Sequence, residues 1–159
     1  LKIEPLISER IFDIVSLIED VTIEKDVVKL KSFRPLGVKE DIKERLITAL
    51  EKNGFQPPFK DEIIRDLSIS EREIGDILKL LTKEGAIVRI NDSLYITKNQ
   101  FDALLELLKG FYSKKTEMTV AEFRDLLSTT RKYALPFLEY LDSNKITLRV
   151  GDIRKFMLK

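Results

Sequence analysis

The chain lacks cysteine, histidine and tryptophan, and these absences exclude several classes of function. Without histidine there can be no Ser-His or Cys-His nucleophile pair, and no histidine can ligate a metal. Neither of the common glycine-rich phosphate-binding motifs occurs in the 159 residues. The 27 acidic residues are scattered over helical patterns, which is typical of solvated faces rather than of acid–base pairs. We therefore expect no enzymatic activity, no cofactor and no metal site in this chain.

Long apolar runs are also missing, and none approaches the roughly 20 residues that a membrane-spanning helix needs. We therefore expect no membrane partner. The first residues do not resemble a secretory signal, and the lack of cysteine fits a reducing compartment, so we expect a cytoplasmic location. Because the sequence begins with Leu1 rather than methionine, we predict that the natural protein continues N-terminally.

Residues 99–159, here called the last winged helix, follow the pattern of a helix-turn-helix with an added β-hairpin. Thr119 and Glu122 form a capping-box pattern, and the polar break at 128–130 can cap a further helix. Gly151 can take the positive φ of a tight hairpin turn. The expected elements are a helix at 99–114, a short extended segment at 117–118, helices at 120–127 and 131–143, and strands at 146–150 and 153–157.

Residues 36–98, here called the middle winged helix, show the same order about sixty residues earlier. Ser70 and Glu73 form a second capping box, and Gly85 is suited to a helix C-cap. Segment 65–67 has the same letters, RDL, as segment 124–126, and such recurrence indicates a structural repeat. The expected elements are helices at 38–52, 60–67 and 71–84, and strands at 86–90 and 94–97.

Residues 1–35 resemble the second half of the same unit, with a helix expected at 8–19 and a hairpin at 21–31. The sequence thus predicts an α+β, mostly α chain of tandem winged helices, with domains at 1–35, 36–98 and 99–159. We expect it to be a monomer.

Basic residues are in excess only near the C-terminus. Residues 115–159 contain nine basic and six acidic side chains, whereas residues 36–98 contain eleven and twelve and residues 1–35 contain six and seven. A polyanion is therefore expected to bind the last winged helix, and the middle winged helix is interpreted as a spacer.

The hairpin of the last winged helix places Arg149 opposite Arg154 if Gly151 and Asp152 form a two-residue turn. We expect both arginines to project from the outer face, where a phosphate between them would relieve their repulsion. The alternative is that two exposed arginines extend into water at little cost. The apolar residues expected to pack on the helices are Ile146, Leu148, Val150, Ile153 and Met157.

The third helix of this unit begins with Arg131, Lys132 and Tyr133. Cations oppose the helix dipole at this end. Free amides, two basic side chains and an aromatic ring nevertheless suit a backbone phosphate and a stacked base. Alternatively, Tyr133 belongs to the core, because it shares a stripe at helical spacing with Phe137 and Tyr140.

Three segments, TVAEFRDLL at 119–127, TRKYALPFLEYLD at 130–142 and RVGDIR at 149–154, resemble the C-terminal end of bacterial selenocysteine-specific translation elongation factors. Segment GFQPP at 54–58 resembles the preceding unit of that family. The resemblance implies winged helices behind a GTPase body, which would lie upstream of this chain together with the site for selenocysteyl-tRNA, and would act on the ribosome. It also implies that the last unit binds the stem-loop in selenoprotein mRNA that recodes a UGA codon.

Carried over from that family, RNA contacts come from the start of the last recognition helix and from the wing. Asp152 is then expected to accept hydrogen bonds from a loop guanine, or else to cap its own turn. The implied RNA-binding residues are Thr130, Arg131, Lys132, Tyr133, Arg149, Gly151, Asp152, Arg154 and Lys155.

Two other functions remain open from the residues alone. A tandem winged-helix transcription regulator would insert its third helix into the DNA major groove, but Leu135, Leu138 and Leu141 look like core residues rather than base readers. A protein-interaction scaffold would suit the nearly neutral charge of the first two units.

Overall fold

The computed structural model describes residues 21–24, 27–30 and 36–157, and the chain divides into two compact units after Glu40. In the first unit, β1 (Val21–Glu24) pairs antiparallel with β2 (Val27–Leu30). This confirms the expected hairpin. The helix predicted at 8–19 lies outside the described residues.

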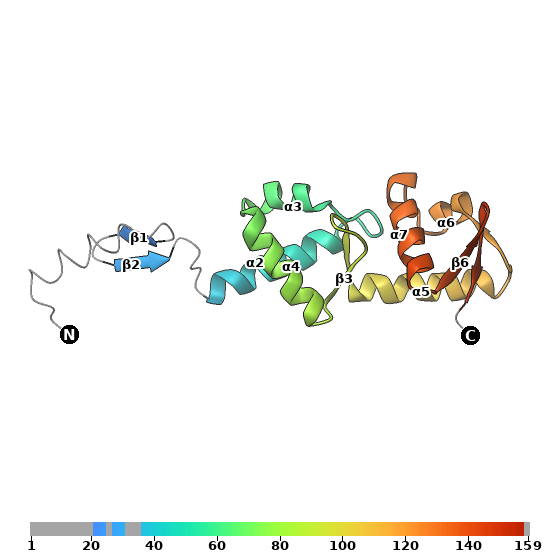
Figure 1. Ribbon diagram of the computed structural model, residues 1–159, viewed down its shortest axis with the longest axis horizontal. Coiled ribbons are helices and arrows are strands. Elements are labelled where there is room, and N and C mark those ends of the chain that lie inside the picture. The colour runs from blue at the N-terminus through green and yellow to red at the C-terminus, as the bar shows by residue number, and fades with distance from the viewer. Residues whose placement is uncertain (1–20, 25–26, 31–35, 158–159) are drawn as a thin grey trace, which may run out of the picture. The chain divides into compact units, whose positions relative to one another are not determined.

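From Leu36 onward the chain is mostly helical with small β-sheets (Figure 1). Each predicted element is present within two residues of its expected bounds. The order of two successive winged helices is thereby confirmed. The elements are α2 (Leu36–Glu51), α3 (Lys60–Leu67), α4 (Glu71–Lys83), β3 (Ile87–Arg89), β4 (Tyr95–Thr97), α5 (Lys98–Tyr112), β5 (Met118–Thr119), α6 (Val120–Leu126), α7 (Arg131–Ser143), β6 (Thr147–Val150) and β7 (Ile153–Phe156).

Both predicted capping boxes form. The Ser70 hydroxyl accepts a hydrogen bond from the Glu73 amide at 3.2 Å, and the Glu73 carboxylate accepts one from the Ser70 amide at 3.0 Å. At the start of α6, Thr119 and Glu122 repeat this exchange at 3.2 and 2.9 Å. Each box satisfies two amides that a helix leaves without an internal partner, which explains why these helices begin where they do.

Backbone turns recur at a spacing of sixty residues. Ser68 and Ser128 both have positive φ, 52° and 48°, and their amides donate to carbonyls three residues earlier, at 3.2 and 3.1 Å. Gly85 and Lys145, after the third helices, have φ of 73° and 57°. The RDL segments at 65–67 and 124–126 are only 59 residues apart. They are therefore one residue out of step with the structural repeat, in which equivalent turns are sixty residues apart.

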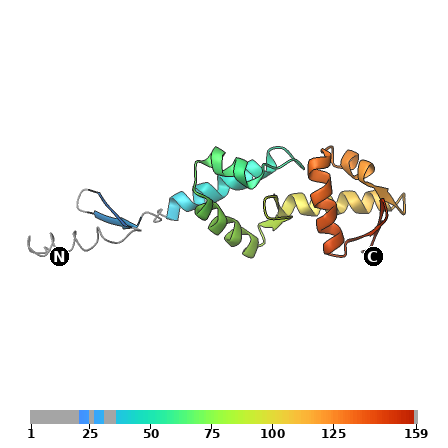
Figure 2. The ribbon, with the colours of Figure 1, turned by 45° about the horizontal axis from the view of Figure 1, so that its top comes forward.

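The second unit contains two apolar cores. The boundary between these cores does not coincide with the boundary between the two winged helices in the sequence. One core joins α2, α3 and α4. The other contains Leu104 and Phe137 of the last winged helix together with Ile90, Leu94 and Ile96 from the hairpin of the middle one. Helix α5, the first helix of the last winged helix, follows directly after that hairpin (Figure 2). Among the described residues, no helix is long and apolar enough to cross a membrane.

Candidate nucleic-acid interface

The start of α7 carries the first group of predicted RNA-binding residues, and it is less well capped than α6. Thr130 occupies the N-cap position, but its side chain makes no cap hydrogen bond. Only its carbonyl is used, accepting from the amides of Tyr133 and Ala134 at 3.0 and 2.9 Å. The predicted cap by a hydroxyl of the 128–130 break is therefore wrong. Thr130 and Arg131 are exposed, and within the described part of the chain Arg131 has no ion-pair partner.

Lys132 and Tyr133 are already engaged with the middle winged helix. The Tyr133 ring stacks on Phe59, with centroids 5.3 Å apart and an interplanar angle of 27°. The Lys132 ammonium lies 4.1 Å from the centroid of the same Phe59 ring, a favourable cation–π contact. Burial, with a smaller contribution from the Glu62 carboxylate, raises the pKa of the Tyr133 phenol. One face of the Tyr133 ring is thus packed against Phe59, and the side chain as a whole is half-buried.

The loop that provides Phe59 also holds the residues before α7. The Gln56 amide donates to the carbonyl of Ser128 at 3.2 Å, and the Thr129 hydroxyl donates to the carbonyl of Phe55 at 3.0 Å. This contact between the two winged helices is not predicted from the sequence. The segment 54–58 was visible as part of a family resemblance, but nothing in its local pattern indicates which distant residues it touches.

The wing has the predicted pairing. Arg149 lies opposite Arg154 in the β6–β7 register, and Gly151 has φ of 61° in the turn. A side chain at Gly151 would meet no atom within 4 Å, so glycine is required there by the backbone angle and not by space. Strand β7 lies in the centre of a three-stranded sheet, between β5 and β6.

Except at Ile146, which packs against the core as expected, the faces of the wing are the reverse of those expected. Arg154 is only 3% exposed, and its Nε donates to an Asp142 carboxylate oxygen at 3.2 Å. Asp142 also accepts a hydrogen bond from the Thr147 hydroxyl at 2.6 Å. The prediction that Arg154 and Arg149 project together is wrong, and so is the predicted packing of Leu148 and Val150, which are 49% and 48% exposed. Met157, also expected inside, is 52% exposed.

Aromatic packing explains this orientation. The Tyr112 ring stacks on Phe156 with centroids 5.1 Å apart, and the Tyr112 hydroxyl donates to the carbonyl of Arg154 at 3.0 Å. Burial raises the pKa of Tyr112 to about 12, although the nearby Arg154 charge acts in the opposite direction. A face with Thr147, Arg154 and Phe156 can be fully satisfied against α5 and α7, which makes the polar face the inner one.

The remaining predicted wing residues are accessible. Arg149 is exposed, and its Nε donates to the carbonyl of Gly151 at 3.1 Å, which fixes the guanidinium beside the turn. Lys155 pairs with Glu117 at 3.3 Å across the surface. Asp152 is exposed and has no side-chain hydrogen bond to another described residue, so it does not cap its own turn. Of the predicted cations, Arg131 and Arg149 are therefore available to a polyanion at once, and Lys132 and Lys155 become available after release from Phe59 and Glu117.

Known proteins resemble the segment of the chain that contains this site. The family described as the winged helix of elongation factor SelB matches residues 111–156. The chain carries a winged helix of the SelB family. A selenocysteine-specific elongation factor of Desulfomicrobium baculatum is 32% identical over 108 residues, covering 68% of this chain and 17% of that protein. The chain therefore spans about a sixth of the length of this SelB relative, and the resemblance seen in the sequence is confirmed.

Two solved structures share the fold of the SelB winged helices. The mRNA-binding domain of SelB from E. coli, solved in complex with SECIS RNA, matches 76% of this chain and 97% of that domain, with a TM-score of 0.65 and 21% identity. A bacterial selenocysteine-specific elongation factor, EF-Sec, matches 93% of this chain and 23% of its own, with a TM-score of 0.57 and 23% identity. At these identities the matches establish the tandem winged-helix fold.

Proposed function

We propose that the last winged helix binds a stem-loop of the SECIS kind in selenoprotein mRNA, as part of a selenocysteine-specific elongation factor. The observation that carries this proposal is the SelB family match over 111–156, because this segment includes α6, α7 and the β6–β7 wing, where the accessible cations lie. The SECIS RNA bound in the E. coli structure supports the same ligand class. Binding would tether the GTPase of the complete factor to the mRNA for UGA recoding.

The predicted site residues fall into two groups, those free to contact RNA directly and those already in contact with other parts of the protein. Arg131 and Arg149 are free to contact phosphates, and Asp152 is free to accept hydrogen bonds from a loop base. The Thr130 hydroxyl is available because it caps nothing. Gly151 holds the turn that presents them.

The other predicted residues would act differently. Lys132 and Lys155 would first exchange their contacts with Phe59 and Glu117 for RNA. Tyr133 would fix the direction of α7 through its stack on Phe59, and buried Arg154 would hold the wing in place as a positioning residue.

Recognition of duplex DNA by insertion of α7 is less well supported. Phe137, Leu138 and Leu141 are fully buried, so beyond its first turn α7 offers few side chains for base edges. The narrow major groove of A-form RNA does not admit a helix either, which favours contacts to a loop and to backbone phosphates.

For the complete factor, we propose selenocysteyl-tRNA and the ribosome as further partners, with the catalytic GTPase located outside this chain. We propose that the protein works in the cytoplasm as a monomer, and that this chain has no enzymatic activity of its own.

The test is a binding titration of the whole chain against a SECIS-type RNA stem-loop and a DNA duplex of equal length, at two salt concentrations. We expect tighter binding to the stem-loop, with a salt dependence that corresponds to a few phosphates. Arg131→Ala and Arg149→Ala should each weaken stem-loop binding by about 1–3 kcal/mol. Lys114→Ala, an exposed cation of the same winged helix outside the site, is the matched control. Equal weak binding to both nucleic acids would contradict the proposal.

A further inference from the structure

A second group of cations lines a surface groove of about 530 Å³ in the middle winged helix. Lys79 and Lys83 project from α4, Lys60 opens α3, and Arg89 ends β3. Asp92 is the one acidic residue among those lining the groove. The middle winged helix has a net charge of −1, yet four of its eleven cations gather at this place. The net charge of the unit therefore does not reveal that its cations are clustered in one place.

Two of these cations have no acid to neutralise them. Among the described residues, Lys79 and Lys83 have neither an ion pair nor a hydrogen bond from their side chains, and both are exposed. They are four residues apart on one helix, a spacing at which like charges repel. The mutual repulsion falls when an anion lies between them. An anionic polymer would supply one anion to this pair and further anions to the other cations of the groove.

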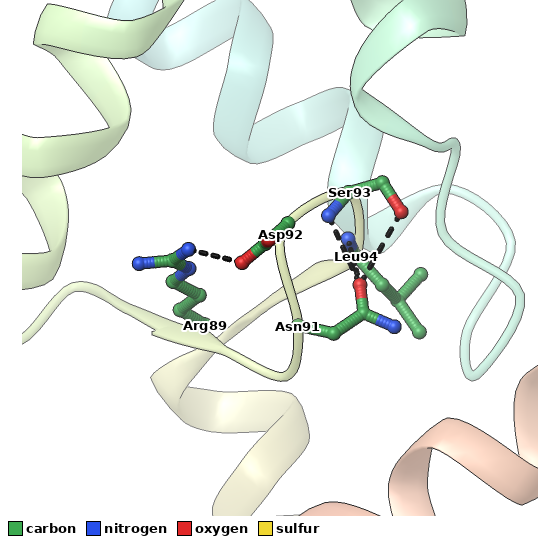
Figure 3. Close-up of polar contacts among 5 residues, drawn as sticks. All are labelled: Arg89, Asn91, Asp92, Ser93 and Leu94. Atoms are coloured by element: carbon green, nitrogen blue, oxygen red, sulfur yellow. Dashed lines mark hydrogen bonds and ion pairs between the residues drawn. The ribbon is translucent and has the colours of Figure 1, made fainter.

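The other two cations each have an ion-pair partner at the surface. Lys60 pairs with Glu71 at 3.0 Å, and Arg89 pairs with Asp92 at the tip of the wing (Figure 3). Each partner is largely exposed, at 79% and 94%, so these pairs are solvated and can be exchanged at little cost. Another acid of α4, Asp76, does not line the groove.

The wing beside the groove has a defined shape. The Asn91 side-chain oxygen accepts hydrogen bonds from the amides of Ser93 and Leu94 at 3.0 and 2.8 Å, as Figure 3 shows. The Ser93 carbonyl in turn accepts from the amide of Lys60 at 2.9 Å, which ties the wing to the start of α3. A rigid rim of this kind lowers the entropic cost of binding, because the loop is already ordered before the ligand arrives.

We propose that this groove is a second nucleic-acid site, which binds the phosphodiester backbone of a double-stranded segment through Lys79, Lys83, Lys60 and Arg89. The site reads charge and shape and not base sequence, because its cations are three lysines and an arginine, and no amide side chain is among the residues that line it. It goes beyond the stem-loop site proposed for the last winged helix, and it assigns a ligand to the unit interpreted from the sequence as a spacer.

The experiment is a titration of the whole chain with two blunt duplexes of about 20 base pairs, one of RNA and one of DNA, neither with a loop. We expect Lys79→Ala with Lys83→Ala to weaken duplex binding about ten- to thirty-fold, and to lower the slope of log affinity against log salt by about two. Preference for the RNA duplex would assign the source of the backbone to RNA, and preference for the DNA duplex would assign it to DNA. Thermal unfolding followed by circular dichroism confirms that the variant is folded.

The matched control is Lys52→Ala with Arg72→Ala, which removes the same charge from exposed positions of the middle winged helix outside the groove. An equal loss in both double variants would reduce the effect to net charge and overturn the proposal. Arg131→Ala with Arg149→Ala separates the two sites. If that variant loses the duplex while the Lys79 and Lys83 variant retains it, the duplex binds the last winged helix and not the groove. Displacement of the duplex by poly-L-glutamate at equal charge concentration would reassign the groove to an acidic protein.

Discussion

The middle and last winged helices share their backbone turns and differ at the start of the third helix. Helix α4 begins with a complete capping box and with the acidic residues Glu71 and Glu73 in its first turn. Helix α7 begins with Arg131 and Lys132, and its N-cap threonine makes no side-chain bond. The first arrangement stabilises the helix through its dipole and repels phosphate, whereas the second sacrifices local stability and leaves the helix start available.

The two wings also differ, because the last wing carries an additional cation. In the pairing register, Arg89 opposite Tyr95 corresponds to Arg149 opposite Arg154. Tyr95 and Arg154 are both buried, at 7% and 3% exposure, so a ring in one unit is replaced by a charge in the other. Asp142 compensates for that charge. A buried ion pair of this type is a weak source of stability but is costly to break from one side.

The largest expected effect comes from breaking that pair. Arg154→Ala should lower the free energy of unfolding by about 3 kcal/mol, because the Asp142 carboxylate loses its cation while only partly exposed. Chemical denaturation measures this change. The double substitution Asp142→Thr with Arg154→Tyr installs the residues found at the equivalent places of the middle winged helix, and it should recover most of the loss. An unchanged unfolding energy in the single variant would show that the pair is fully solvated.

Alkaline pH should lower the stability of the folded chain through Tyr112 of the last winged helix. The pKa of Tyr112 is raised from 10.0 to about 12 in the folded chain, mainly by burial. Between these two values the unfolded chain loses the phenolic proton and the folded chain keeps it, so stability falls as pH rises from 10 towards 12. Unfolding curves at several alkaline pH values measure the slope. Tyr112→Phe should reduce it, and a slope unaffected by that substitution would assign the effect to other groups.

The caps provide a smaller and paired test. Ser70→Ala should cost about 1 kcal/mol of stability, because its hydroxyl accepts the Glu73 amide. Thr130→Ala, at the equivalent position of the last winged helix, should change stability by less than about 0.5 kcal/mol because its side chain caps nothing. Thermal and denaturant unfolding of both variants provides the comparison. Equal losses would indicate that the Thr130 hydroxyl does cap α7 in solution.

The smallest effect is expected at acid pH. The hydrogen bond from Lys115, and then those from the Thr119 amide and hydroxyl, lower the pKa of Glu122 from 4.5 to about 2. The stabilisation is present above pH 4.5 and is lost as pH falls towards 2, because the unfolded chain binds this proton first. Glu122→Gln should flatten that part of the stability profile. A carbon-13 titration of the Glu122 carboxyl by NMR measures the pKa directly, and a normal value would contradict the contacts described.

The sequence predicts the elements of the second unit well because their signals are local. Each capping box lies within four residues, and the turn at Gly151 depends on a single backbone angle. Winged-helix order follows from these signals together with apolar periodicity. The helix start at Arg131 and the pairing of Arg149 with Arg154 are predicted for the same reason.

Local signals could not predict which face of the β6–β7 wing packs against the helices. Alternation places apolar residues on one face, and the usual rule puts that face inside. Here the inner face is chosen by Asp142 and Tyr112, which are 12 and 42 residues from Arg154 in the chain. The contact of Phe59 with Tyr133 joins still more distant residues, and the separation of charge in the middle winged helix disappears in any sum over its sequence.

The core shared between the two winged helices has a consequence for how such proteins can be assembled from parts. Ile90, Leu94 and Ile96 precede α5 but pack with the apolar residues of the last winged helix, and Gln100 of α5 donates to the Leu50 carbonyl at 2.9 Å. A genetic fusion or deletion with its junction at residue 98 would leave that apolar surface in water on both products. We expect recombination to move these two winged helices only as a pair, however readily each is recognised as a module.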